Sequence, residues 1–251
     1  MKTLFRIEND QLPLKKILWY HLYPGIALTI AYIMISGYLV DHGYPGLIAL
    51  LFIELVVLLP ITLVHLGIKG KRLNNKFSFK NCIAYTSRLS VGQYIKWSLL
   101  GIVCCTIVYI PLYPLGLYFK ETIFYWLPAW YFDPSFGTAD MTLIAKAFLA
   151  AIFIDGIAGP VAEELFFRGY LLPRMTAFKN LAPVLNGTLF GLYHFWQPHN
   201  YLAIIAIGII ISYVVWKKKN VFLGMIIHCT LNILGALSGF LAASGGALIA
   251  R

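Results

Sequence analysis

Long apolar runs follow one another along almost the whole chain, with short polar segments between them. A helix that spans a membrane needs about 20 predominantly apolar residues, and its backbone groups must bond within the segment because no water reaches them. Of the 251 residues, 60% are hydrophobic and 12% are charged, whereas a soluble domain carries about 25% charged residues. The mean hydropathy is +0.76. The sequence therefore predicts an all-α fold, a polytopic transmembrane helical bundle.

The apolar runs set the limits of the expected spans. These are residues 17–40, 46–66, 97–119, 143–175, 182–196, 201–216 and 221–241. The fourth run has about 33 residues, too many for one untilted crossing of a core about 30 Å thick. Either its first part projects from the membrane, or a break at Asp155-Gly156 or Gly159-Pro160 divides it, since proline kinks a helix. We therefore expect seven or eight spans.

The charge distribution indicates orientation rather than a nucleic-acid partner. There are 20 lysines and arginines against 10 acidic residues, a net charge of +10, and the basic residues cluster at the ends of apolar runs, where they meet anionic lipid headgroups. The loop at residues 67–96 has no acidic residue; its basic residues are Lys69, Lys71, Arg72, Lys76, Lys80, Arg88 and Lys96. By the positive-inside rule this loop and the N-terminus are expected to be cytoplasmic, in a plasma or inner membrane.

One integrated membrane domain with three regions is expected. Residues 1–142 form a transmembrane scaffold without an evident catalytic cluster, residues 143–241 form the core that carries candidate catalytic residues, and residues 242–251 form a short tail. The aromatic segment at residues 124–132 is interpreted as an interfacial belt rather than a lid. The cysteines form no CxxC pair and are interpreted as packing residues; they are Cys82, Cys104, Cys105 and Cys229.

Charged residues interrupt the apolar run at residues 159–170, GPVAEELFFRGY. An ionisable residue at the centre of a membrane helix costs about 2.5 to 3.5 kcal/mol on insertion scales. Arg168 follows Glu164 by one helical turn, which permits an ion pair, whereas Glu163 is about 100° away around the helix. An unpaired carboxylate in a low-dielectric interior suits a general base near neutral pH. We assign Glu163 to chemistry and Glu164 with Arg168 to structure; a packing network of all three is the alternative.

Two later runs carry further polar residues. His194 lies in one of them, and His228 shares a helix face with Asn232 in the last. Counting about 1.5 Å of rise per residue from the expected cytoplasmic boundaries places Glu163 and His194 about 16 Å deep and His228 about 12 Å deep. These residues therefore come to a similar level near the middle of the membrane. Asn186, two turns before His194, is a candidate for contact with water or substrate.

These residues form three motifs on successive apolar helices. The motifs are Glu163-Glu164-x-x-x-Arg168, Phe190-x-x-x-His194 and His228-x-x-x-Asn232. In this order they resemble the signature motifs of the CPBP family of intramembrane proteases. That family includes CAAX prenyl endopeptidases of the Ras-converting type and bacterial Abi and lysostaphin-resistance-like proteins. The resemblance covers residues 143–241.

The resemblance implies an intramembrane endopeptidase. Glu163 and His194 would activate a water molecule that attacks a peptide carbonyl, while His228 and Asn232 stabilise the oxyanion. Glu164 and Arg168, with Phe190, would support the site. The implied substrate is a prenylated C-terminal tail or, in a bacterium, a leader, pheromone or bacteriocin peptide.

A zinc-dependent mechanism and two functions other than an enzyme are alternatives to this interpretation. Glu163, His194 and His228 are a candidate ligand set for zinc, whose bound water would also be a nucleophile. No HExxH pattern occurs, and we prefer the metal-free mechanism with no cofactor. The alternatives to an enzyme are a bacteriocin-immunity or regulatory protein that binds a peptide, and a proton-coupled transporter. The other histidines are interpreted as packing or interfacial residues; they are His21, His42, His65 and His199.

Overall fold

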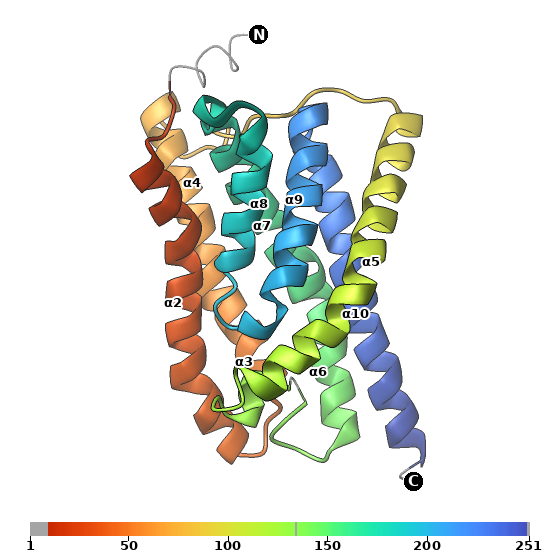
Figure 1. The fold of residues 1–251 in the computed structure, drawn as a ribbon. Helices are drawn as coiled ribbons and strands as arrows, with labels where there is room; N and C mark the ends of the chain where they lie inside the picture. The colour runs from red at the N-terminus through yellow and green to blue at the C-terminus, as the bar shows by residue number, and fades with distance from the viewer. Residues whose placement is uncertain (1–9, 134, 250–251) are drawn as a thin grey trace.

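The computed structural model describes residues 10–249 with the exception of residue 134, and within them it is a bundle of helices (Figure 1). The α-helices are α2 (Leu14–Asp41), α3 (Gly46–Ile53), α4 (Leu59–Asn74), α5 (Val91–Thr122), α6 (Met141–Phe153), α7 (Gly159–Glu163), α8 (Ala182–Leu192), α9 (Tyr201–Lys218) and α10 (Val221–Ile249). Short 3₁₀ helices cover Ala129–Tyr131, Leu172–Arg174, Thr176–Leu181 and Pro198–Asn200. The expected all-α fold is confirmed.

Six helical stretches in the described part of the chain are long and apolar enough to cross a membrane. They are Leu14–Asp41, Gly46–Asn74, Val91–Thr122, Met141–Arg174, Pro198–Lys218 and Val221–Gly245. The expected span at residues 182–196 is the exception, because α8 ends at Leu192 after 11 residues. A helix of that length rises only about 16 Å. The protein is thus an integral membrane protein with six candidate spans and one shorter helix.

Three π-helical segments join α-helices into longer ones. Glu54–Leu58 connects α3 to α4, Ile154–Ala158 connects α6 to α7, and Glu164–Leu171 continues α7. The run Met141–Arg174 is therefore one helical stretch, and the break that would have produced an eighth span is absent. A π turn widens the helix without ending it. Pro160 lies just after such a turn, where the bonding register already changes, so its missing N–H interrupts little.

Pro111 and Pro114 bend α5 (Figure 1). Each proline removes an N–H donor and its ring displaces the preceding turn, which kinks a helix. The C-terminal half of α5 consequently runs beneath the connection between α8 and α9. There Gly116 packs against the backbone of His199, because a glycine leaves room for the close approach.

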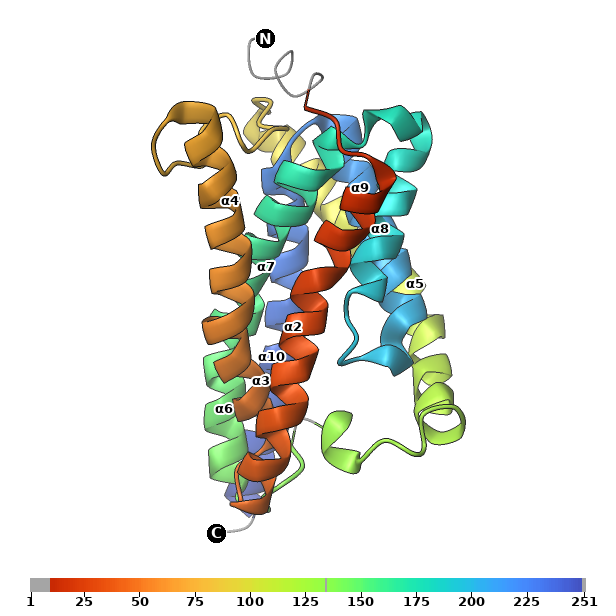
Figure 2. The same ribbon diagram turned by 90° about the vertical axis from the view of Figure 1, so that its left-hand side faces the viewer.

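Small residues allow α8 and α9 to pack closely. A Cβ atom at Gly187 would collide with the backbone of Gly208 and its neighbour Ile209 on α9. Membrane helices associate through such close packing, since lipid is as apolar as the side chains and provides no hydrophobic drive. On another side of the bundle α6 and α10 run along each other (Figure 2).

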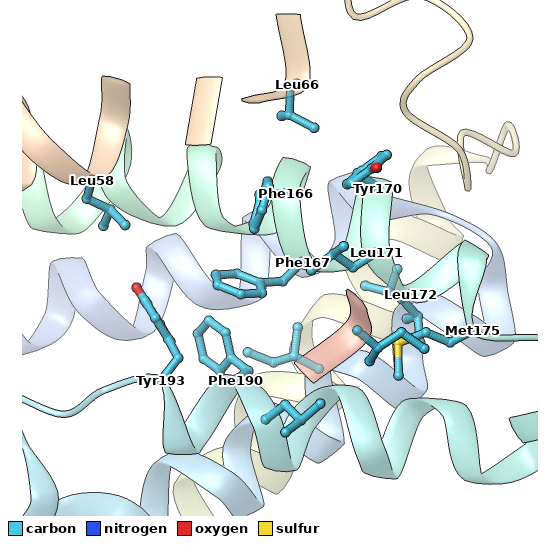
Figure 3. Close-up of a cluster of buried hydrophobic side chains, with 14 of the residues drawn as sticks. Leu58, Leu66, Phe166, Phe167, Tyr170, Leu171, Leu172, Met175, Phe190 and Tyr193 are labelled. Atoms are coloured by element: carbon cyan, nitrogen blue, oxygen red, sulfur yellow. The ribbon is translucent and has the colours of Figure 1, made fainter. Parts of the chain in front are cut away.

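The main core lies where α8 meets the helix that contains α7. Phe167, Phe190 and Tyr193 pack ring against ring there, with centroids 4.9 to 5.5 Å apart (Figure 3). These separations are within the range in which aromatic pairs add about 0.5 to 1.5 kcal/mol beyond burial. This aromatic core holds the end of α8 against α7 and so positions the residues around the cavity described next.

Candidate active site

A cavity of about 540 Å³ lies inside the bundle, and its lining is mostly apolar. The polar residues that line it are Glu54, Thr106, Tyr109, Asp155, Glu163, His194, Gln197, His228 and Asn232. All four residues that the sequence singles out as catalytic are in this set. They come from α7, from the connection after α8 and from α10, and they line one cavity.

Glu163 is the last residue of α7 and is 6% exposed. Its Oε1 accepts a hydrogen bond from the hydroxyl of Tyr193. Its Oε2 lies 3.7 Å from Nε2 of His228. The helical spacing predicts that Glu163 does not pair with Arg168, and the structure agrees. The carboxylate of Glu163 faces the cavity.

Glu164 and Arg168 form the expected ion pair. Nη1 of Arg168 lies 2.8 Å from Oε1 of Glu164, and both side chains are fully buried. The guanidinium also lies over the ring of Phe190, 3.7 Å from its centroid. The flat face of the guanidinium has no hydrogen-bond donor, and here it makes a cation–π contact instead. Phe190 thus supports the ion pair through its ring.

His228 lies between the two glutamates, which the sequence did not indicate. Its Nδ1 is 3.0 Å from Oε1 of Glu164, and its Nε2 faces Glu163. A carboxylate paired with arginine accepts hydrogen bonds and has none to donate, so Nδ1 of His228 carries the proton. Glu164 therefore has a second role, since it orients a histidine of the cavity.

The backbone orients His194. Its Nδ1 is 2.8 Å from the carbonyl oxygen of Phe190, one turn earlier, and a carbonyl only accepts, so Nδ1 donates. The lone pair of the neutral ring is then on Nε2, where a base is needed. The ring also packs against Trp196 at 4.7 Å between centroids, which restricts its rotation.

Asn232 is held by the π-helical segment Ile154–Ala158. Its Nδ2 donates to the carbonyl of Asp155 at 2.9 Å. A π turn leaves carbonyl groups outside the regular bonding register, and such turns are frequent at functional sites. One N–H of the Asn232 amide is used in this contact, and the second remains for a ligand in the cavity.

Three residues of the site were not expected. Glu54 is 5% exposed and lines the cavity, although the first 142 residues were interpreted as a scaffold. The signal was available, because Glu54 is a carboxylate inside an apolar run of hydropathy 2.9. For Asp155 the sequence indicates only a position where the fourth apolar run could be divided. Tyr193 had no sequence signal, since its contact with Glu163 joins two separate helices.

A buried polar network extends from Arg168 away from the cavity. Nε of Arg168 donates to Ser212 at 3.2 Å, Ser212 donates to Oδ1 of Asn186 at 2.8 Å, and Nδ2 of Asn186 lies 2.9 Å from Nε2 of His21. Asn186 is therefore a packing residue, and its expected contact with water or substrate is wrong. His21 is buried, as interpreted, and bonds to the carbonyl of Ile17.

The cavity holds side chains of the types that bind metal ions. Within residues 10–133 and 135–249, no group of three or more His, Cys, Asp and Glu side chains is arranged to hold one. Glu163, His194 and His228 share the cavity, and Nδ1 of each histidine is bonded to an oxygen acceptor, as is also usual for histidines that bind a metal through Nε2. The metal-free mechanism and the zinc alternative both stay predictions.

Residues 145–234 match the family model described as "Type II CAAX prenyl endopeptidase Rce1-like". This segment of the chain is similar to that family. It contains all four predicted catalytic residues together with Glu164, Arg168 and Phe190, and it falls within the region that resembles the CPBP family. The resemblance is confirmed.

A curated protein is similar to part of the chain. Over 83 residues the chain is 32% identical to UPF0177 protein YxdF of Lactococcus lactis subsp. lactis (strain IL1403). The match covers 33% of this chain and 46% of the relative, so it spans about half of the relative's length. No solved structure matches the chain.

Proposed function

We propose that the protein is an intramembrane endopeptidase that hydrolyses a peptide bond with water activated by Glu163 and His194. The observation that carries the proposal is the meeting of Glu163, His194, His228 and Asn232 at one cavity inside a membrane bundle. The match of the surrounding segment to an endopeptidase family supports it. The cavity, at about 540 Å³, is within the usual size range of ligand sites, about 300 to 1,000 Å³.

In the proposed first step, water attacks the peptide carbonyl and its proton passes to the Glu163 carboxylate. Nε2 of His194 accepts a hydrogen bond from the same water and orients it. The hydroxyl of Tyr193 fixes the Glu163 carboxylate by donating to Oε1, leaving Oε2 for the water. The new bond joins the water oxygen to the carbonyl carbon, whose oxygen becomes an oxyanion.

In the second step the oxyanion collapses and the C–N bond breaks. The proton held by Glu163 passes to the departing nitrogen, which leaves as an amine. The free N–H of Asn232 donates to the oxyanion, and His228 donates from Nε2 when its ring carries both protons. One such donor typically contributes about 2.7 to 4 kcal/mol to the transition state.

The proposed substrate is a peptide segment at the membrane, either a prenylated C-terminal tail or a leader, pheromone or bacteriocin peptide. The mostly apolar cavity lining suits a lipidated or apolar segment. Membrane lipids are the other expected partner. A comparison of peptides from membranes with wild type and with Glu163→Ala, His194→Ala or His228→Ala tests the proposal.

A product that is lost in all three variants and kept in Glu121→Ala would support the endopeptidase proposal. Glu121→Ala is the control because Glu121 is exposed near the end of α5. If folded variants leave every product unchanged while the wild type has a phenotype, the peptide-binding alternative holds.

The mechanism is proposed to need no metal. Cleavage by purified protein should therefore withstand 1,10-phenanthroline, and loss of cleavage that zinc restores would contradict this.

We also propose that the N-terminus and the basic loop at residues 67–96 are cytoplasmic. The described parts of both lie at one end of the bundle (Figure 1). The backbone of Leu12 bonds to Arg174, and the side chain of Arg174 bonds to the carbonyl of Cys82. In intact cells, a membrane-impermeant thiol reagent should leave a cysteine at Lys76 unlabelled and label one at Asp140.

A further inference from the structure

Glu54 is a buried carboxylate that the proposed mechanism does not use. It begins the π-helical segment Glu54–Leu58, is 5% exposed and lines the cavity. Among the side chains of residues 10–133 and 135–249, none forms a hydrogen bond or ion pair with it. A carboxylate without such a partner inside an apolar bundle is costly, so its presence there needs a reason.

The position of the Glu54 carboxylate is defined by a glycine. A Cβ atom at Gly159 would collide with Oε1 of Glu54, so the carboxylate rests on the backbone of α7. Gly159 lies one helical turn before Glu163. Glu54 is thus about one helical turn from the proposed general base and lines the same cavity.

Acidic side chains outnumber basic ones in the lining of the cavity. Among the described residues, Glu54, Asp155 and Glu163 line it, whereas no lysine or arginine does. Arg168 is engaged by Glu164, and the basic groups in the part of the lining that the structure describes are His194 and His228. Nδ1 of His194 is bonded to a carbonyl and Nδ1 of His228 to Glu164, so three carboxylates share the lining with two histidines that are each already engaged on one side. A cationic group that entered the cavity would find a partner that the protein itself does not provide.

We propose that Glu54 binds a cationic group of the substrate, either a lysine or arginine side chain or the ammonium of an amino terminus. The inference rests on the proposed function, because it names the chemistry of the peptide that the cavity accepts. Glu54 is a substrate-binding residue in this view. The apolar lining contacts the residues on either side of the cationic group, and Glu163 acts on the adjacent bond.

Binding of short peptides to the full chain in nonionic detergent tests this. The His194→Ala variant is used as the background, because it prevents cleavage without changing the carboxylates. Three probes separate the two kinds of cation: acetyl-Leu-Lys-Leu-Leu-amide, the neutral peptide with norleucine for lysine, and the norleucine peptide with a free amino terminus in place of the acetyl group. Glu54→Gln is the test variant, and Glu121→Gln, at an exposed site, is the control.

At least one cationic probe is expected to bind about 10-fold tighter than the neutral probe, as one charge-assisted hydrogen bond allows. Glu54→Gln should remove this preference and Glu121→Gln should keep it. A preference for the lysine peptide alone indicates a side chain, and for the free amine alone an amino terminus. Equal binding of all three probes, or a preference that persists in Glu54→Gln, overturns the inference. Cleavage by wild type tests the proposed function separately.

Discussion

Nδ1 of His228 lies 3.0 Å from Oε1 of Glu164, the same oxygen that accepts a hydrogen bond from Arg168 at 2.8 Å. One buried carboxylate oxygen therefore connects the ion pair to a histidine of the cavity. Glu164 cannot be changed without affecting both, and the ion pair is part of the support of the site rather than a separate packing feature.

Arg168→Met should strongly destabilise the protein. The substitution leaves Glu164 as an unpaired buried charge, which typically costs about 3 to 5 kcal/mol. The double variant Arg168→Met with Glu164→Gln removes both charges and should recover at least half of the loss. Denaturant unfolding in micelles measures the free energy of unfolding. Losses that simply add in the double variant would contradict the pairing.

Tyr193→Phe should lower the cleavage rate while the fold persists. The ring keeps its packing against Phe167 and Phe190, and only the hydroxyl that donates to Glu163 is lost. We expect a decrease of about 10- to 100-fold, since loss of a donor to a charged group is worth about 1.5 to 3 kcal/mol. Tyr109→Phe is the matched control, because Tyr109 lines the same cavity without contacting Glu163. Equal rates for both variants would refute the role of Tyr193.

Gly224→Ala should impair the protein through Glu164. A Cβ atom at Gly224 would collide with Oε2 of Glu164, which has no room to retreat because its residue is fully buried. We expect a loss of about 1 to 3 kcal/mol in the free energy of unfolding, as for other overpacked sites. Gly37→Ala is the control, since nothing lies within 4 Å of its Cβ position. That change should be neutral or stabilising by up to about 1 kcal/mol.

Ser212→Ala should reduce stability more than catalysis. Its hydroxyl accepts from Arg168 and donates to Asn186, and both partners are buried, so each would lose a hydrogen bond. The expected cost is about 1 to 3 kcal/mol. Thermal unfolding and the cleavage rate at a temperature where the variant stays folded separate the two effects. A rate loss comparable to that of Glu163→Ala would place Ser212 in the catalytic machinery instead.

Local features of the chain were predictable from the sequence. The length of the apolar runs indicates the membrane bundle because backbone groups in lipid must bond within their own helix. The ion pair of Glu164 with Arg168 follows from their spacing on one helix. The common depth of Glu163, His194 and His228 follows from helical rise, and the structure brings their side chains to one cavity.

Tertiary structure decided the rest. The contacts of Tyr193 with Glu163, of Asn186 with Ser212 and of Glu54 with the backbone at Gly159 each join different helices, and helical spacing does not specify which faces meet. The length of α8 and the continuity of the helix through Pro160 depend on π turns and on packing, which an apolar pattern does not encode. The sequence by itself determined which segments are apolar enough to cross a membrane; the packing of the helices decided which of their residues touch.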